Sequence, residues 1–324
     1  MKAVLCREFG PIERLAFEDA ASPVAGRGQV VIKVAAAGVN FPDALLVQGK
    51  YQLKPPLPFS PGGEFAGTVK EVGAGVTHLA PGDAVVGIAS HGGYAEEALV
   101  DAHAAIPLPA GTDPALAAVL MIAHGTALHA LEDRAALARG ETLLVLGAAG
   151  GVGLAAVEIG KLLGARVIAC ASTPEKLAVC RQRGADELID YSREDLRARL
   201  SALTGGRGVD VVYDAVGGAY SEPALRSTGW RGRFLVIGFA AGAIPQIPLN
   251  LPLLKGSSIV GVFWGEFVRR EPARNRDNIR RLLEWLAAGA LVPHIGARYP
   301  LSGAADALVA LTERRVTGKI VLIP

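Results

Sequence analysis

The feature that most constrains this chain is a buried-strand pattern that leads through a glycine-rich turn into a helix. Residues 142–146 (TLLVL) have the length and branching of a fully buried parallel strand. A glycine-rich turn follows at residues 147–153, and apolar residues then recur at helical spacing over residues 154–163. This order predicts a dinucleotide-binding site, because the N-terminus of the helix offers unpaired N–H groups to a pyrophosphate. An ordinary tight turn in an α/β protein is the alternative interpretation.

The turn can be read as the fingerprint G-x-G-x-x-G, with Ala148, Gly150 and Gly153 at its three key positions. At the second position, glycine lets the backbone approach the pyrophosphate closely. At the third position, glycine lets the helix pack against the strand. We therefore expect Gly150, Gly151 and Val152 to contact the pyrophosphate of a bound dinucleotide.

The end of the next predicted strand, residues 165–171, indicates which dinucleotide is bound. Sites for NAD carry Asp or Glu at this point to bind the ribose 2′-hydroxyl, but this chain has Ala171. Without a carboxylate to repel it, a 2′-phosphate could accept a hydrogen bond from Ser172 and be neutralised by Lys176. The sequence therefore predicts NADPH rather than NADH. Ser172 or Thr173 could also be a helix N-cap, and both interpretations can hold together.

Composition agrees with a two-domain α/β enzyme. A chain of 324 residues is too long for one hydrophobic core. The net charge is only +2 and the basic residues are spread out, so we expect neither nucleic acid nor an anionic membrane as a partner. There is no secretory pattern and no apolar run of membrane-spanning length, which predicts a cytoplasmic location. Cys6, Cys170 and Cys180 share no metal-ligand spacing and are expected to be reduced.

The first third of the chain differs in pattern from the rest. Up to about residue 115, short strand patterns alternate with turns rich in proline and glycine, which predicts a small barrel-like β domain. The strands of this domain are expected at residues 1–6, 29–37, 64–72, 84–88 and 94–100.

An Ala/Leu-rich helical stretch at residues 117–137 leads into strands that alternate with helices, which predicts a doubly wound parallel sheet. Its six strands are expected at residues 142–146, 166–171, 187–190, 209–215, 233–238 and 257–263. The tail predicts helices at residues 278–289 and 304–313. A last strand at residues 319–323 could close back onto the N-terminal domain.

Several short motifs are spread along the chain. They are AAGVNFPD (36–43), PGGEFAG (61–67), GGYAE (92–96), the turn at 147–153, GGRGVD (205–210), VGG (216–218) and LLKG (253–256). With these motifs the chain resembles the medium-chain dehydrogenase/reductase superfamily over essentially its whole length. Within that superfamily it is similar to the zinc-independent quinone oxidoreductase branch, the zeta-crystallin-like family.

The resemblance implies an α/β fold with two domains. A GroES-like β-barrel substrate domain would comprise residues 1–118, completed by residues 266–324. A Rossmann domain with a doubly wound parallel sheet would bind NADPH with residues 119–265, and the active site would lie in the cleft. Family members are usually homodimers that extend the Rossmann sheet across a twofold axis.

Departures from the zinc-dependent relatives indicate that no metal takes part. Those relatives place Cys where this chain has Asn40, and His where it has Gly63. Their four-cysteine structural lobe is also absent, and the six histidines are scattered without ligand spacing. Each histidine is expected to be a surface or packing residue. Because dehydrogenation of an alcohol in such enzymes needs a metal to stabilise the alkoxide, that reaction is not expected.

Without a metal, the expected chemistry is hydride transfer from the nicotinamide to an electron-poor acceptor. The resemblance therefore implies an NADPH-dependent reductase of quinones or α,β-unsaturated carbonyls (enones), acting on a small-molecule substrate. Two alternatives stay open. One is an enoyl or acrylyl thioester (coenzyme A) reductase, and the other is a non-catalytic NADPH-binding protein with a structural or RNA-binding role. The near-neutral charge argues against RNA.

Three residues of the first domain are candidates for catalysis. Asn40 could hydrogen-bond the substrate oxygen or the nicotinamide ribose, or form an Asx turn before Pro42. Asp43 could orient Asn40, although a helix cap is the favoured interpretation. Tyr51 matches a tyrosine that related enoyl reductases place over the active site, where it could supply a proton. A loop-closing aromatic residue is the alternative for Tyr51.

Further cofactor contacts are expected from the second domain. Thr126 matches a family position near the nicotinamide, and Tyr191 matches one beside the 2′-phosphate, although either could be purely structural. The remaining candidates all lie at the carboxyl ends of predicted strands, where such sheets bind ligands. They are Gly217, Gly238, Phe239, Val262 and Phe263, of which the two phenylalanines could equally be core residues.

The densest basic stretch lies between residues 269 and 281. It could bind the phosphates of a coenzyme A thioester, or form a solvated helix face paired with Glu271, Asp277 and Glu284. Its members are Arg269, Arg270, Arg274, Arg276, Arg280 and Arg281.

Overall fold

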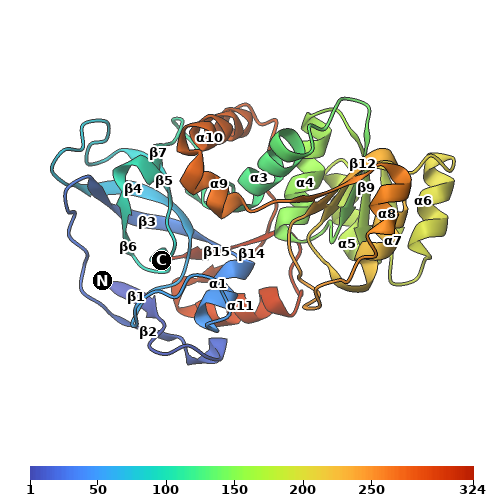
Figure 1. The fold of residues 1–324 in the computed structure, drawn as a ribbon. Helices are drawn as coiled ribbons and strands as arrows, with labels where there is room; N and C mark the ends of the chain where they lie inside the picture. The colour runs from blue at the N-terminus through green and yellow to red at the C-terminus, as the bar shows by residue number, and fades with distance from the viewer. The chain divides into compact units, whose positions relative to one another are not determined.

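The computed structural model describes all residues from Met1 to Pro324 and divides into two compact units (Figure 1). Unit 1 comprises Met1–Ile122 and Leu282–Pro324, and unit 2 comprises Ala123–Arg281. The expected domain boundaries are 118/119 and 265/266. The observed division lies four residues later at the first boundary and sixteen residues later at the second. Residues 266–281 group with unit 2, because Phe267 stacks on His129 at a ring-centroid distance of 3.9 Å and an ion pair joins residues 281 and 132.

Unit 2 contains a six-stranded sheet in which every pair of neighbours is parallel. The strand order β10-β9-β8-β11-β12-β13 confirms the predicted doubly wound Rossmann sheet. The strands are β8 (Thr142–Leu146), β9 (Arg166–Ala171), β10 (Glu187–Asp190), β11 (Val209–Asp214), β12 (Thr228–Val236) and β13 (Ser258–Gly261).

Helices cover both faces of this sheet because alternate residues of each buried strand point to opposite faces. On one face, Gly160 of α4 (Gly151–Leu162) lies directly over the side chains of Leu143 and Val167. On the other face, Leu144 and Ile168 share an apolar cluster with three further helices. These helices are α6 (Leu196–Thr204), α7 (Ser221–Arg226) and α8 (Asn250–Lys255), while α5 (Pro174–Gln182) packs beside β9 and β10.

The helical stretch predicted at residues 117–137 is not one helix. It comprises α2 (Pro114–Ala117), α3 (Met121–Leu128) and a π-helical turn (His129–Arg134). The π-turn is held by a bond between His129 Nδ1 and Asp133 Oδ2 at 2.8 Å. Two later helices, α9 (Trp264–Arg270) and α10 (Pro272–Ala287), follow the sheet.

Unit 1 is built on a mostly antiparallel seven-stranded sheet with the path β14-β15-β3-β4-β5-β7, with β6 paired to β3. The chain's last strand, β15, pairs with β3, which confirms that the C-terminus closes back onto the N-terminal domain. The strands are β3 (Gln29–Val39), β4 (Glu64–Val72), β5 (Ala84–Ile88), β6 (Glu97–Asp101), β7 (Ala105–Pro107), β14 (Ile295–Pro300) and β15 (Lys319–Ile323).

Smaller elements complete unit 1. A hairpin of β1 (Lys2–Leu5) and β2 (Ala16–Asp19) precedes the sheet. Helix α1 (Phe41–Val47) follows β3 directly, and α11 (Ala304–Thr312) buries Ala307 and Leu308 in the same apolar core as the strands. The sequence patterns did not predict β2, β7 and β14, which are short or lie at the edge of a sheet with little buried surface.

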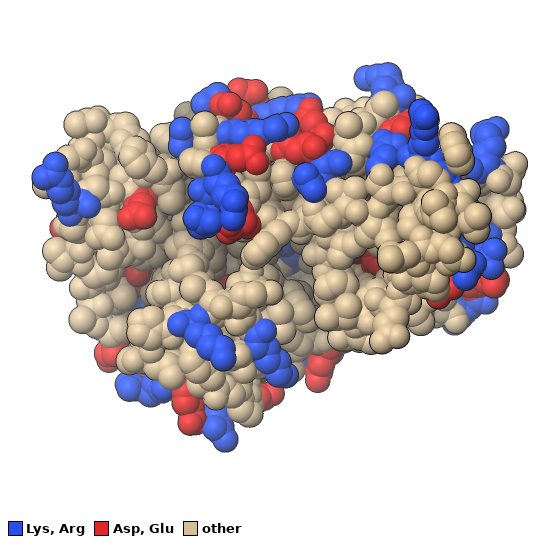
Figure 2. Space-filling view, viewed as in Figure 1, with Lys and Arg blue, Asp and Glu red and all other residues tan.

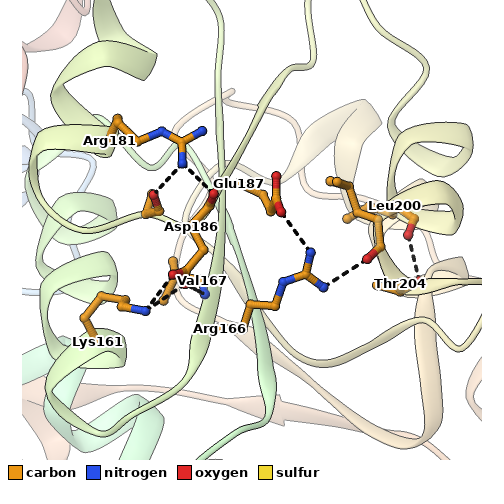
Figure 3. Close-up of polar contacts among 10 residues, drawn as sticks. Lys161, Arg166, Val167, Arg181, Asp186, Glu187, Leu200 and Thr204 are labelled. Carbon is orange, nitrogen blue, oxygen red and sulfur yellow. Dashed lines mark hydrogen bonds and ion pairs between the residues drawn. The ribbon is translucent and has the colours of Figure 1, made fainter.

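The amino ends of β9 and β10 are closed by paired charges (Figure 3). Arg166 Nη2 donates to Glu187 Oε1 at 3.0 Å, and Lys161 Nζ donates to Asp186 Oδ2 at 2.8 Å. The same Asp186 oxygen accepts the backbone N–H of Val167 at 2.7 Å. Because each of these charges has a protein partner, we interpret this end of the sheet as structural. The structure contains no helix with the length and hydrophobicity required for a membrane span.

Candidate active site and cofactor site

The glycine turn after β8 has the close packing that a dinucleotide fingerprint requires. Gly147 adopts a φ of +65°, and a Cβ there would lie 2.7 Å from Val216. A Cβ on Gly153 would lie 2.2 Å from the carbonyl oxygen of Gly147. The residue that makes the tight turn is therefore Gly147 rather than Ala148, which the sequence alignment to the fingerprint placed first. Gly153 has its predicted role in helix packing.

The N-terminus of α4 offers backbone donors that the protein does not use. Gly150 is the N-cap and is exposed, and no side chain caps the helix. The first N–H bonded within the helix is that of Leu154, which donates to Gly150 O at 2.8 Å. The N–H groups of Gly151 and Val152 precede this bond and have no protein acceptor. This geometry can accept an anionic phosphate at the positive end of the helix dipole.

Parallel pairing brings the other predicted cofactor residues to one edge of the unit 2 sheet. Leu146, the last residue of β8, lies beside Cys170 of β9 and Asp214 of β11. Asp214 in turn lies beside Val236 of β12, and Val236 beside Gly261 of β13. The candidates follow these positions directly, so they lie along the same carboxyl edge. They are Ser172, Gly217, Gly238, Phe239, Val262 and Phe263.

The segment after β9 forms the expected helix N-cap, and its contact with a 2′-phosphate stays a prediction. Thr173 is the N-cap of α5 and its hydroxyl accepts the N–H of Lys176 at 3.3 Å. Ser172 is half-buried and its hydroxyl takes no part in this cap. Lys176 is half-buried, and its ammonium forms no ion pair. Tyr191, which follows β10, packs against Tyr220 in a tilted arrangement with ring centroids 4.2 Å apart.

Asp214 shapes the turn that carries Gly217. Its Oδ1 accepts the N–H groups of Val216 and Gly217, both at 2.8 Å, and its Oδ2 accepts the hydroxyl of Ser221 at 2.6 Å. Gly217 has a φ of +70°, and a Cβ at this position would lie only 2.9 Å from the ring of Phe239. The sequence reasoning missed Asp214, although its position at the end of a buried strand was a usable signal.

The remaining unit 2 candidates differ in exposure. Phe239 and Phe263 are 38% and 59% exposed, so neither is a core residue. Val262 donates its N–H to Val236 O at 3.1 Å, and Gly238 and Val262 are half-buried. Thr126 lies half-buried on α3, which His124 ties to α4 through a bond to Glu158 at 2.8 Å. Its role beside the nicotinamide stays a prediction.

The polar centre of unit 1 is a buried network around Glu64. Glu64 Oε1 accepts from Asn40 Nδ2 at 2.9 Å and from Lys319 Nζ at 2.7 Å. Its Oε2 accepts the backbone N–H of Ile122 at 2.9 Å. Lys319 Nζ also donates to Asn40 Oδ1 at 2.5 Å and to Val39 O at 3.2 Å. Glu64 has no exposed surface and Lys319 is 4% exposed, so the charges compensate each other away from water.

This network determines what Asn40 can do. Both ends of its amide have protein partners, and the residue is only 6% exposed. The amide orientation follows from Lys319, which is a donor only, so the oxygen must face the ammonium and the nitrogen must face Glu64. Direct contact of Asn40 with a substrate or ribose stays a prediction. Sequence reasoning missed Glu64 and Lys319, which lie far apart in the chain.

Asp43 contributes to the cap of α1 from inside the helix, while Asn40 occupies the N-cap position. Asp43 is residue N3 of α1, and its Oδ2 accepts the N–H of the N-cap residue Asn40 at 2.8 Å. The same oxygen accepts the Tyr94 hydroxyl at 2.8 Å. Burial raises the pKa of the Asp43 carboxyl to about 6, against the opposing effect of the bonds from Tyr94 and Asn40. Tyr94 is fully buried and was not predicted to take part.

Tyr51 lies near this carboxyl and keeps its hydroxyl available. It is half-buried and packs against the apolar cluster that contains Cys6 and Phe59. Partial burial raises the pKa of its hydroxyl, and the nearby charge of Asp43 raises it further. A phenol in this environment remains protonated at neutral pH and can donate a hydrogen bond or a proton.

The arginine stretch is largely a paired, solvated surface. Figure 2 shows basic and acidic side chains interleaved over the region of α10. Asp277 is the one expected partner that forms a close pair, with Arg280 at 3.0 Å. The other close partners are Glu266 for Arg269 and Arg270, Asp133 for Arg274, and Glu132 for Arg281.

No group of three or more His, Cys, Asp or Glu side chains is arranged to hold a metal ion.

Comparisons with known proteins match this architecture. An alcohol dehydrogenase GroES-like domain model matches residues 26–110, and a zinc-binding dehydrogenase model matches residues 151–288. The chain is 40% identical to a quinone oxidoreductase-like protein 2 homolog from Nematostella vectensis, covering 99% of this chain and 88% of the relative. The quinone oxidoreductase-like protein 2 of Rattus norvegicus is 38% identical, covering 99% of this chain and 91% of that protein.

Solved structures agree with the sequence comparisons. Escherichia coli quinone oxidoreductase, described in complex with NADPH, superposes with a TM-score of 0.92 at 30% identity, covering 100% of both chains. The fold is that of an oxidoreductase of the medium-chain dehydrogenase/reductase superfamily. Within that class, the chain belongs to the quinone oxidoreductase-like family.

The raised pKa of Asp43 gives a stability prediction. A carboxyl that binds its proton more tightly when folded contributes stability below its unfolded pKa of 3.8, and this contribution is lost as the pH rises through about 6. Relative to Asp43→Asn, which does not titrate, the wild-type free energy of unfolding should fall by about 2 kcal/mol between pH 4 and pH 7. Urea unfolding over this pH range measures the difference.

The matched control for this experiment is Asp19→Asn. Asp19 is exposed, and its bond from Lys2 lowers the pKa of its carboxyl, so the wild-type protein should show no such fall relative to this variant. A difference between wild type and Asp43→Asn that stays constant from pH 4 to pH 7 contradicts the assignment.

Proposed function

We propose that the protein is an NADPH-dependent reductase that transfers a hydride to quinones or α,β-unsaturated carbonyls without a metal ion. The single observation that carries the proposal is the carboxyl edge of the unit 2 sheet. There, the unused N–H groups of Gly151 and Val152 lie in register with a strand end that has Ala171 in place of a carboxylate. The NADPH in the solved structure of the E. coli relative supports the same cofactor for this chain.

The residues of unit 2 fit NADPH along its length. The N-terminus of α4 would hold the pyrophosphate, and the segment at Ser172 and Lys176 would hold the 2′-phosphate, with Tyr191 beside it. The backbone of Gly217, Gly238 and Val262 would line the cofactor at the carboxyl edge. The exposed rings of Phe239 and Phe263 would form apolar walls beside it. Thr126 would face the nicotinamide. When bound, NADPH supplies the hydride from its nicotinamide ring.

Residues of unit 1 support a metal-free mechanism. Asn40 and Gly63 occupy the two positions where the zinc-dependent relatives have metal ligands, and Gly63 has no side chain. The Lys319 ammonium already lies 2.5 Å from Asn40 Oδ1 and 2.7 Å from Glu64 Oε1. A second cation beside this ammonium would meet electrostatic repulsion. Asn40 and Asp43 would therefore shape the site, and their polar atoms would position α1 rather than a metal.

The proton that accompanies the hydride can come from Tyr51. Its hydroxyl stays protonated at neutral pH because burial and the Asp43 charge both raise its pKa. Hydride transfer to an enone leaves negative charge on the acceptor, which a phenol can stabilise by hydrogen bonding and then neutralise by donating its proton. Solvent would return the proton to Tyr51. A coenzyme A thioester is not favoured, because five of the six arginines at 269–281 have carboxylate partners.

We also propose a homodimer formed along β13. This strand is the open edge of its sheet, since β12 is its only neighbour. Large apolar side chains surround the edge: Trp230, Leu253 and Leu254 are 73%, 78% and 73% exposed. An uncovered strand edge with an apolar patch is unfavourable in water, and a second copy of the same strand would cover both.

The proposed function is tested by following NADPH oxidation at its near-ultraviolet absorbance against a panel of quinones, enones and enoyl thioesters. We expect oxidation with quinones and enones, lower rates with NADH, and no loss of rate after treatment with a metal chelator. A lack of oxidation with every acceptor would favour the non-catalytic binding protein. Equal rates with NADH would contradict the role of Ser172 and Lys176.

Tyr51→Phe tests the proton donor. The variant should reduce enones about 100-fold more slowly than the wild type, because general acid catalysis typically contributes at least this factor. Its affinity for NADPH should not change, since the residues proposed to bind the pyrophosphate and the 2′-phosphate lie in unit 2. Tyr299→Phe, a substitution in β14 of the same unit, is the control. Unchanged enone reduction by Tyr51→Phe would remove this residue from the mechanism.

The double variant Leu253→Glu/Leu254→Glu tests the dimer. Sedimentation equilibrium should give twice the chain mass of 33.5 kDa for the wild type and a single chain mass for the variant, because buried carboxylates would oppose association. Val24→Glu, which charges a side chain that is 74% exposed in unit 1, should remain dimeric. A monomeric wild type would refute the proposal.

A further inference from the structure

The loops that follow β9 and β10 are joined to each other. The two strands run in parallel with Ala171 opposite Asp190, so both loops begin at the same level of the sheet edge. The N–H of Tyr191 donates to Ala171 O at 3.2 Å. The hydroxyl of Ser192 donates to Ser172 O at 3.1 Å. Residues 191–193 are therefore held beside the segment to which we assign the 2′-phosphate.

The carboxylate of Asp190, the last residue of β10, orders the loop that follows this strand. Its Oδ1 accepts both the N–H of Ser192 at 3.1 Å and the hydroxyl of Ser192 at 2.5 Å. Its own N–H donates to Glu194 Oε1 at 2.8 Å. The Asp190 side chain is only 11% exposed. This carboxylate is thus turned into the loop, and its charge faces the protein rather than the open edge.

Arg193 is the next cation along this loop, and its guanidinium is largely unused. Its side chain is 76% exposed, and its only ion pair is long, at 3.9 Å from Nε to Asp190 Oδ2. Its charge reaches the first turn of α5. The pKa of Glu175 there is lowered mainly by hydrogen bonds from its own backbone N–H and from Thr173, and to a smaller extent by Arg193. Arg193 therefore lies close to the helix turn that carries Lys176.

We propose that Arg193 is a second cationic ligand of the 2′-phosphate and so helps to select NADPH over NADH. This inference rests on the proposed function. A phosphate monoester carries close to two negative charges, which one ammonium cannot neutralise. A guanidinium offers a planar fork of donors that matches phosphate oxygens, whereas Lys176 acts as a point charge. Together with the Ser172 hydroxyl, the two cations would bind the 2′-phosphate from both loops.

The test is isothermal titration calorimetry of the full chain and its variants with four ligands: NADPH, NADH, 2′,5′-ADP and 5′-AMP. Arg193→Gln should weaken NADPH and 2′,5′-ADP about tenfold, the factor that corresponds to one charge-assisted hydrogen bond. Binding of NADH and 5′-AMP should change by less than about twofold, because these ligands lack the phosphate. Lys176→Gln should act in the same way, and the double variant should lose most of the preference for NADPH.

Arg199→Gln is the matched control, because Arg199 is a nearby arginine that is already paired with Glu194 at 2.6 Å. It should leave all four affinities unchanged. If the wild type binds neither NADPH nor 2′,5′-ADP, the proposed function fails, and this inference fails with it. If the wild type prefers NADPH but Arg193→Gln keeps that preference, or weakens NADH equally, only the role of Arg193 is wrong.

Discussion

The buried carboxylate of Glu64 is the interaction on which unit 1 depends. It gathers the side chains of Asn40 and Lys319, which lie 279 residues apart, and the backbone N–H of Ile122. An unpaired charge at this depth would cost several kcal/mol, so these segments are stable only when they meet. This explains why the last strand of the chain belongs to the N-terminal fold. It also explains why the start of α1, and with it Asp43, has a fixed position.

In unit 2, the corresponding constraint is the parallel sheet. A parallel register places the carboxyl ends of all strands at one edge, so residues from distant parts of the sequence form one surface. The two ends of the sheet differ in their chemistry. At the amino end, Arg166 and Lys161 are paired with carboxylates (Figure 3). At the carboxyl edge, backbone donors of α4, Lys176 and Arg193 lack close partners, as expected where a phosphorylated ligand binds.

The two units thus contribute different chemistry to the proposed reaction. Unit 2 offers positive charge and backbone donors suited to an anionic cofactor. Unit 1 offers a half-buried phenol, Tyr51, whose pKa is raised by burial and, to a smaller extent, by the charge of Asp43. In unit 1, the buried side chains of Asn40, Glu64 and Lys319 are satisfied among themselves, and Tyr51 is the polar group that we propose to meet the acceptor. A small neutral acceptor such as a quinone suits this arrangement, because the negative charge formed on it is the charge that a phenol can neutralise.

The local sequence determined those features that depend on short-range patterns. Continuous apolar runs and the glycine turn predicted all six strands of the Rossmann sheet, and an N-cap signal predicted the start of α5. Only the tertiary structure decided which residues meet. Glu64, Tyr94 and Lys319 read as ordinary strand and loop residues, and Arg193 as one more surface cation. Their roles arise from strand register and burial, which bring together groups that no local pattern relates.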